Sequence, residues 1–165
     1  MIKLIFLDID GVLNSNRYMK SPQYFDETKD YDPRGMEIIN KAHHTHLNPE
    51  AVRLVNLLVD KTGAEVILSS TWRNRYSIDE MNAMLSMRGA TFKIVGITPV
   101  FFSFRGRGGE IKDFLEDLDG EITFVILDDI NQFHDYGFDE QFIQTTEEDG
   151  LTMAHIERAI KVLNG

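Results

Sequence analysis

Short apolar runs alternate with amphipathic helical segments along most of this chain. The runs at residues 3–8, 64–69, 91–96, 122–127 and 141–145 have the length and composition of buried β-strands. Apolar spacing, with capping and stop signals, predicts helices over residues 49–63, 77–89, 110–118 and 152–163. Strands that alternate with helices form a parallel sheet through right-handed crossovers. The pattern therefore predicts an α/β fold with a central, mainly parallel sheet.

The size and charge of the chain limit the kinds of protein it can be. Its 165 residues fit one domain, 1–165, with a single core. The formal net charge of −10 opposes a broad, nonspecific nucleic-acid-binding surface. The absence of cysteine excludes thiol nucleophiles, thiolate metal sites and a disulfide-linked partner. No apolar run has the length of a membrane span or a signal peptide, so we expect a cytoplasmic protein that is not bound to a membrane.

Polar side chains follow the predicted strands at their carboxyl ends, which is where parallel sheets bind ligands. Asp8 and Asp10 follow the first strand, and Asp128 and Asp129 follow the fourth. A hydroxyl cluster, residues 69–71, follows the second strand. We expect these side chains to converge on one edge of the sheet.

Carboxylates gathered at such an edge predict a hard divalent cation. In a partly desolvated cleft they repel one another unless a cation or a proton intervenes. An oxygen-only ligand set favours Mg²⁺, which prefers one or two carboxylates together with waters and a phosphate oxygen. One carboxylate can then attack phosphorus while a second protonates the leaving oxygen. Gly11 permits the sharp turn that this needs, and an Arg or Lys near a helix start can neutralise the phosphoryl oxygens.

Three segments resemble motifs of a known superfamily. "LDIDGVLN" (7–14), "VILSSTWR" (66–73) and "VILDD" (125–129) resemble motifs I, II and IV of the haloacid dehalogenase (HAD) superfamily of aspartate-nucleophile phosphohydrolases. With "RGGEI" (107–111) and "DGLT" (149–152), the chain looks closest to HAD domains associated with bacterial and phage RNA-repair proteins. The resemblance implies a three-layer α/β/α Rossmann-like HAD fold with a minimal or small cap insert, and Mg²⁺ as the cofactor.

The resemblance also implies a role for each motif residue. Asp8 would be the nucleophile that forms an aspartyl-phosphate, and Asp10 the general acid and then the base for water. Ser69 would hydrogen-bond the phosphoryl oxygens, with Ser70 as the alternative.

The implied metal site uses the same acids. Asp128 would bind Mg²⁺ directly, alongside the Asp8 carboxylate and the Asp10 backbone carbonyl. Asp129 would be a second acidic residue that supports the site.

The cation of motif III has two candidates in this sequence. We favour Arg107, at the start of a helix, over Lys112, which lies inside it. The expected substrate-binding residues are Gly11, Ser70, Arg73 and Lys112, with Trp72 bracing the loop beside Arg73.

Residues 14–47 do not fit the alternation of strands and helices. An irregular connection of this length is more often a lid, a flap or a small cap insert than a tether. Tyr24, Phe25 and Tyr31 within it could form a small lid core or a substrate platform. The histidines at 43, 44 and 46 are expected in a solvated loop, because no second cluster supports a metal site.

These observations predict Mg²⁺-dependent hydrolysis of a phosphomonoester through an aspartyl-phosphate. The favoured substrate is a 3′-phosphate end of nucleic acid, on the strength of the resemblance alone. The net charge of −10 favours the alternative, a small phosphorylated metabolite or nucleotide. Two other classes stay open: a noncatalytic HAD-like binding module in a repair assembly, and a receiver-like phosphoacceptor with slow turnover.

Overall fold

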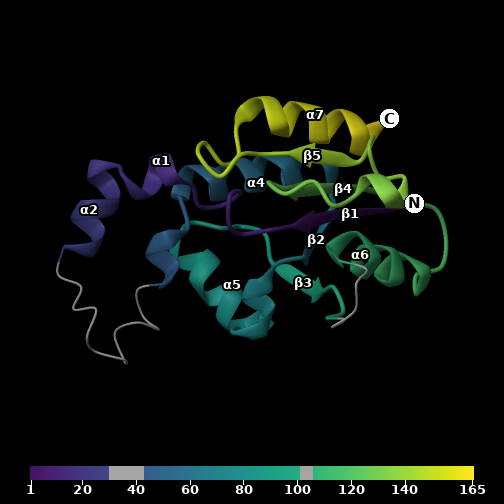
Figure 1. Ribbon diagram of the computed structural model, residues 1–165, viewed down its shortest axis with the longest axis horizontal. Coiled ribbons are helices and arrows are strands. Elements are labelled where there is room, and N and C mark those ends of the chain that lie inside the picture. The colour runs from purple at the N-terminus through teal and green to yellow at the C-terminus, as the bar shows by residue number, and fades with distance from the viewer. Residues whose placement is uncertain (30–42, 101–105) are drawn as a thin grey trace.

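A parallel sheet of five strands forms the centre of the protein. The computed structural model describes residues 1–29, 43–100 and 106–165. The strands are β1 (Ile2–Leu7), β2 (Glu65–Leu68), β3 (Ile94–Ile97), β4 (Ile122–Asp128) and β5 (Phe142–Gln144), in the spatial order β3-β2-β1-β4-β5 (Figure 1). All neighbouring strands are parallel, which confirms the predicted α/β class.

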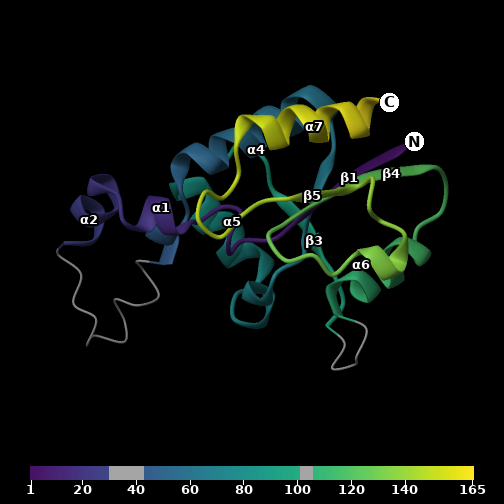
Figure 2. The ribbon, with the colours of Figure 1, turned by 45° about the horizontal axis from the view of Figure 1, so that its top comes forward.

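Helices cover both faces of the sheet. The helices α4 (Pro49–Thr62) and α7 (Met153–Asn164) pack on one face, and α6 (Gly106–Glu116) packs on the other beside the 3-10 turn η3 (His134–Tyr136) (Figure 2). Helix α5 (Ile78–Met87) shares the core of α4 and α7. Side chains of β1 alternate between the two layers: Ile5 and Leu7 join the first core, and Leu4 and Phe6 join the second. The three-layer α/β/α architecture is therefore confirmed, with a continuously apolar strand at its centre.

Capping residues set the ends of α4 and the start of α5 close to the positions that the sequence predicts. Asn48 caps the start of α4, and Gly63, with a φ of 67°, ends it. Ser77 opens α5 through the expected capping box. Helix α6 begins at Gly106, ahead of the expected start at residue 110. The glycine-rich first turn carries no apolar pattern, so the sequence does not reveal it as helical. This earlier start places the motif III candidates on one helix.

The segment 14–47 contains two short helices and a 3-10 turn in its described part. They are α1 (Asn16–Met19), α2 (Pro22–Thr28) and η1 (His43–His46), and α1 and α2 extend from the body at the carboxyl ends of the strands (Figure 1). Tyr24 and Phe25 lie on α2, whereas Tyr31 lies outside the described residues. A lid, flap or cap role for this segment stays a prediction.

Arg88, at the end of α5, fastens this segment to the body. Its Nε donates to the Leu47 carbonyl oxygen at 2.7 Å, and its Nη2 lies 2.8 Å from Glu27 Oε2 on α2. The guanidinium also contacts the hydroxyl of Tyr18, a buried residue of α1. Burial raises the pKa of Tyr18 to about 12, so this hydroxyl stays protonated and donates to the Thr45 carbonyl oxygen.

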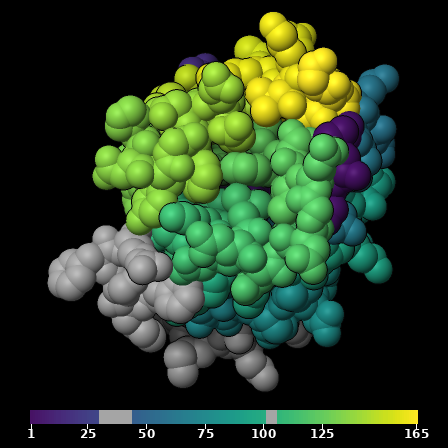
Figure 3. All heavy atoms as spheres, turned by 90° about the vertical axis from the view of Figure 1, so that its right-hand side faces the viewer, coloured from purple at the N-terminus to yellow at the C-terminus, as the bar shows by residue number. Residues whose placement is uncertain are grey.

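The two chain ends lie together, on the side of the molecule opposite α1 and α2. Lys3 Nζ donates to Asn164 Oδ1 at 2.7 Å. Seen from that side, the N-terminal residues lie next to α7 (Figure 3). Within the described residues, no helix has the length and apolar character needed to cross a membrane.

Candidate active site

The carboxyl ends of β1, β2 and β4 meet at the middle of one sheet edge. β1 is the central strand, with β2 on one side and β4 on the other. Backbone pairing continues just past the strands: Asp8 N–H donates to the Leu127 carbonyl at 3.0 Å, and Ser69 N–H donates to the Leu7 carbonyl at 2.9 Å. This register brings Asp8, Ser69 and Asp128 together where the strand order reverses.

Arg107 forms a buried ion pair with two of these carboxylates. Its Nη1 lies 2.6 Å from Asp8 Oδ2 and also contacts Asp128 Oδ2. Arg107 reaches them from the first turn of α6, which packs closely because Gly108 has no side chain: a Cβ there would overlap the Tyr136 ring. The structure therefore brings Arg107, rather than Lys112, to the predicted nucleophile.

Burial dominates the electrostatics of this cluster. It raises the pKa of Asp8, although Arg107, the Ser70 hydroxyl and the Ile9 N–H all favour the ionised form. Burial and then repulsion from Asp8 raise the pKa of Asp128 to about 7. Burial alone would lower the pKa of Arg107, but the two carboxylates outweigh it and the net shift is upward. Asp8 and Asp128 therefore share the positive charge of a single guanidinium, that of Arg107.

Asp8, Asp128 and Asp129 form an acidic group that could hold a metal ion. One carboxylate oxygen from each lies within 4.8 Å of the others. Gly11 permits the approach of Asp129, because its φ is 71° and a Cβ there would lie 2.5 Å from Asp129 Cγ. The donors are all oxygens with excess negative charge, so they fit a hard dication such as Mg²⁺. The proposed ligation by the Asp10 backbone carbonyl stays a prediction.

The two serines after β2 have different surroundings. Ser70 hydrogen-bonds the Asp8 carboxylate through its hydroxyl, and the same oxygen accepts from Trp72 N–H at the start of η2 (Thr71–Asn74). Ser69 is 1% exposed, and its Oγ has no hydrogen-bond partner among the described residues. A buried hydroxyl without a partner is costly, which is why Ser69 is the better candidate to receive a ligand oxygen.

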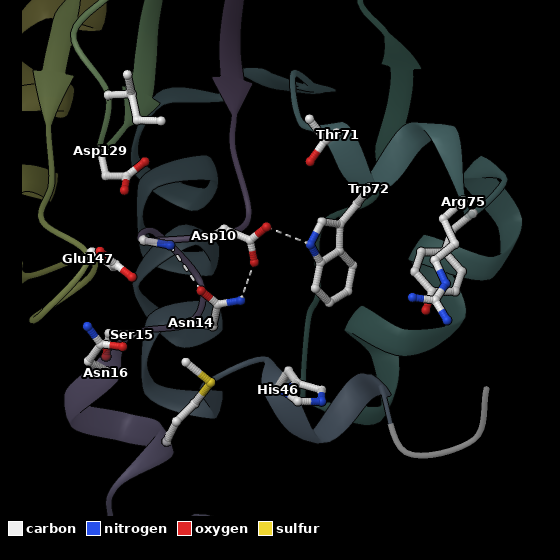
Figure 4. A pocket seen from close by; sticks show the side chains of 14 residues that line it. Asp10, Asn14, Ser15, Asn16, His46, Thr71, Trp72, Arg75, Asp129 and Glu147 are labelled. Carbon is white, nitrogen blue, oxygen red and sulfur yellow. Dashed lines mark hydrogen bonds between the residues drawn. The ribbon is translucent and has the colours of Figure 1, made fainter. Parts of the chain in front are cut away.

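Asp10 lines a pocket that Asp129 also borders, and its carboxylate points toward Asn14 and Trp72 (Figure 4). Asn14 Nδ2 donates to its Oδ1 at 2.7 Å, and the indole Nε1 of Trp72 donates to its Oδ2 at 3.0 Å. Asn14 in turn accepts from Gly11 N–H at 3.0 Å. The exposed Asp10 carboxylate is therefore held at both oxygens by N–H donors.

Comparison with known proteins identifies the family. The family described as "HAD domain in Swiss Army Knife RNA repair proteins" matches residues 4–156. The chain belongs to this family. Among solved structures, a chain of the "Structure of Pnkp1/Rnl/Hen1 complex" has a similar fold, with a TM-score of 0.53 and 21% sequence identity. That match covers 90% of the present chain and 47% of the other, so this chain spans about half the length of its structural neighbour. No curated protein matches its sequence.

Arg73 lies elsewhere in this HAD domain than the sequence suggests. The sequence places it at the substrate, but its Nη2 lies 2.5 Å from Glu110 Oε2 on α6, and its Nη1 donates to Thr98 Oγ1 at 2.8 Å. The Arg73 side chain is only 5% exposed. Arg75, two residues further along, lines the pocket instead.

Lys112 is also remote from the acids. Its side chain is 55% exposed and lies 3.7 Å from Glu116, one turn further along α6. The expectation for the histidines needs a correction too, because His46 is half-buried and lines the pocket, with Nδ1 3.3 Å from the Tyr24 hydroxyl. Burial lowers its pKa.

Sequence reasoning missed the role of Asn14. Asn14 ends the motif I segment "LDIDGVLN" and begins the irregular segment, and neither pattern indicates that it holds the Asp10 carboxylate four residues earlier. A usable signal exists in retrospect, since an Asn amide in a tight turn commonly bonds nearby backbone, as this one does with Gly11. Trp72 was expected to brace the loop, and its bond to Asp10 could not be read from spacing.

Proposed function

We propose that this HAD domain hydrolyses phosphomonoesters through an aspartyl-phosphate on Asp8. The observation that carries the proposal is the pairing of Asp8 with Arg107, next to Asp128 and to the Ser69 hydroxyl, which no other described residue hydrogen-bonds. A carboxylate fixed beside a cation is suited to attack an anionic phosphoryl group, because the cation offsets the repulsion between them.

The first half-reaction transfers the phosphoryl group to the protein. An Asp8 oxygen bonds to phosphorus, and the bond between phosphorus and the leaving oxygen breaks. Asp10 gives its proton to that oxygen, which departs as an alcohol. Arg107 and Ser69 bind the phosphoryl oxygens during the transfer.

The second half-reaction restores the enzyme. Asp10, now ionised, takes a proton from water as the water oxygen bonds to phosphorus. The bond from phosphorus to Asp8 breaks, and inorganic phosphate leaves. Asn14 and Trp72 suit Asp10 to this role, because an N–H donor at each oxygen fixes the position of its carboxylate in the pocket.

Mg²⁺ is the cofactor that we propose, held by Asp8, Asp128 and Asp129. Their oxygen-only donor set and mutual proximity support this choice. When bound, Mg²⁺ supplies positive charge that offsets the charges of the carboxylates and of the phosphoryl group.

For the substrate we propose a 3′-phosphate end of nucleic acid. The support is the family, whose description names RNA repair proteins. A small phosphorylated metabolite or nucleotide is the second candidate, and the net charge of −10 supports it. We further propose that residues 1–165 act as one domain in which segment 14–47 is a lid, a flap or a small cap insert.

Measuring the release of inorganic phosphate distinguishes a nucleic-acid end from a small phosphate ester as the substrate. A 3′-phosphorylated oligonucleotide is compared with mononucleotides and sugar phosphates, with Mg²⁺ or with EDTA. We expect faster Mg²⁺-dependent release from the oligonucleotide; equal or faster turnover of the small esters would reject a nucleic-acid end.

The Asp8→Asn variant tests the nucleophile. We expect it to lose activity by on the order of 10³-fold or more, because the amide cannot form the intermediate. Asp60→Asn, at an exposed site on α4, is the matched control and should behave as the parent. An Asp8→Asn enzyme as fast as the parent would show that the nucleophile is assigned wrongly. A parent that binds the phosphorylated end but releases no phosphate would indicate a binding module.

A further inference from the structure

We propose that the pocket beside Asp10 binds the terminal nucleoside of the substrate, with its base stacked against Trp72 and Tyr76. This inference rests on the proposed function and deepens it, because it states which part of a nucleic acid the site contacts. Recognition is then confined to the last nucleotide.

The size and place of the pocket carry the first step. It has a volume of about 730 Å³ and opens beside Asp10, Gly11 and Asp129. Pockets of roughly 300–1,000 Å³ hold small-molecule ligands, so this one accommodates much more than a phosphoryl group. Because Asp10 must reach the leaving oxygen, the group that carries the phosphate lies in this pocket.

Aromatic side chains form one wall of the pocket, across from Asn14 and Ser15 (Figure 4). The rings of Trp72 and Tyr76 are 5.6 Å apart between centroids, at 44° to each other. The Arg75 guanidinium lies 5.6 Å from the centroid of the Tyr76 ring. Aromatic rings with an adjacent Arg are the usual surface on which unpaired bases stack.

The charge of the pocket argues against contacts to further phosphates. Its described lining includes three acids, Asp10, Asp129 and Glu147, and one permanent cation, Arg75. A strand of several phosphates needs several cations, since each bound phosphate is normally neutralised by Lys or Arg. Stacking is therefore the source of affinity beyond the reacting phosphate.

Trp72 connects the base to the chemistry. Its indole N–H holds Asp10 at 3.0 Å while its ring lines the pocket. A base stacked on this ring puts the attached sugar beside the group that protonates the leaving oxygen. The arrangement thus selects a phosphate carried by a nucleoside over one carried by a simple alcohol.

Trp72 is the only tryptophan in the chain, so its fluorescence reports on the pocket directly. The Asp8→Asn variant is titrated with a nucleoside 3′-monophosphate and, separately, with ribose 5-phosphate. We expect the nucleotide to quench the fluorescence and ribose 5-phosphate to leave it unchanged. Adding Tyr76→Leu should raise the Kd of the nucleotide roughly 5- to 150-fold. Adding Met87→Leu, at a 63% exposed site on α5, is the control and should leave it unchanged.

A second titration tests the limit of one nucleotide. A 3′-phosphorylated trinucleotide should bind within about threefold of the mononucleotide, with a salt dependence close to that of one phosphate. Quenching by ribose 5-phosphate, or a Kd that Tyr76→Leu does not change, would overturn the stacking. Affinity that rises steeply with length would overturn the restriction to one nucleotide. Failure of the proposed function gives a different result: the parent binds the nucleotide as described but releases no phosphate.

Discussion

Replacing Arg107 with methionine should destabilise the metal-free protein by about 3–5 kcal/mol. The side chains of Arg107, Asp8 and Asp128 are 13%, 4% and 0% exposed, so the carboxylates lose their cation in a buried place. Methionine keeps an unbranched side chain but removes the charge. In a domain of 165 residues this loss lowers the Tm by roughly 6–20 °C.

The loss should depend on pH and on Mg²⁺. Burial and repulsion raise the pKa of Asp128 to about 7, so at pH 5 the acids carry a proton and need less compensation. A carboxyl whose pKa is raised on folding stabilises the protein at low pH, and this contribution disappears as the pH rises through about 7. The Arg107→Met defect should therefore be larger at pH 8 than at pH 5. Saturating Mg²⁺ should reduce it, because the carboxylates then face a dication.

Urea denaturation at the two pH values, with EDTA or Mg²⁺, measures the free energy of unfolding. Lys112→Met is the matched control on the same helix, since its ion pair with Glu116 has side chains 55% and 62% exposed. Such a pair contributes about 1 kcal/mol or less. The reasoning is refuted if Arg107→Met costs no more than Lys112→Met, or if its cost is the same at both pH values.

Two further substitutions test the site loop and the C-terminal helix. Gly11→Ala should cost about 1–2 kcal/mol through its φ of 71° and should also weaken Mg²⁺ binding in calorimetry, because the new Cβ displaces Asp129. Gly63→Ala is the control: its φ is 67° and a Cβ there has nothing within 4 Å, so it should lower stability without changing Mg²⁺ binding. Equal Mg²⁺ affinities for Gly11→Ala and the parent would contradict the argument. At the start of α7, Thr152 N–H donates to His155 Nδ1 at 3.1 Å, and burial lowers the pKa of His155. The free energy of unfolding should therefore fall by about 1 kcal/mol as the pH drops below about 6.5, the pKa of histidine in the unfolded chain. In His155→Gln, the glutamine keeps the cap but does not titrate, so its urea midpoint should decline less than that of the parent as the pH falls. An equal decline in the two proteins would contradict this explanation.

The fold and the convergence of the main acids could be predicted because each depends on a short-range signal combined with one topological rule. The strand before Asp8 and the strand before Asp128 are visible as apolar runs. Parallel pairing then brings their carboxyl ends to one edge, and the structure has both carboxylates on Arg107. Neither step needs knowledge of side-chain packing.

The partners of the loop side chains could not be predicted in this way. Arg73 follows a strand end, as a substrate ligand would, yet its charge is taken by Glu110, which lies on a helix 37 positions later in the chain. Trp72 and Asp10 are 62 positions apart and meet through two loops. Such contacts depend on where helices and loops settle in three dimensions, and no periodicity in the sequence encodes them.

Asp8 and Asp10 are the same residue type two positions apart, yet the fold gives them opposite surroundings. Asp8 continues the buried line of β1, is 3% exposed, and meets Arg107 and Asp128. The chain then turns at Gly11, which leaves Asp10 exposed in a pocket between two N–H donors. A nucleophile has to be fixed next to the phosphoryl-binding cation, whereas a proton carrier has to meet both the leaving group and water. We propose that the glycine turn divides the two acids between these tasks, so a change at position 11 should affect chemistry that neither aspartate performs alone.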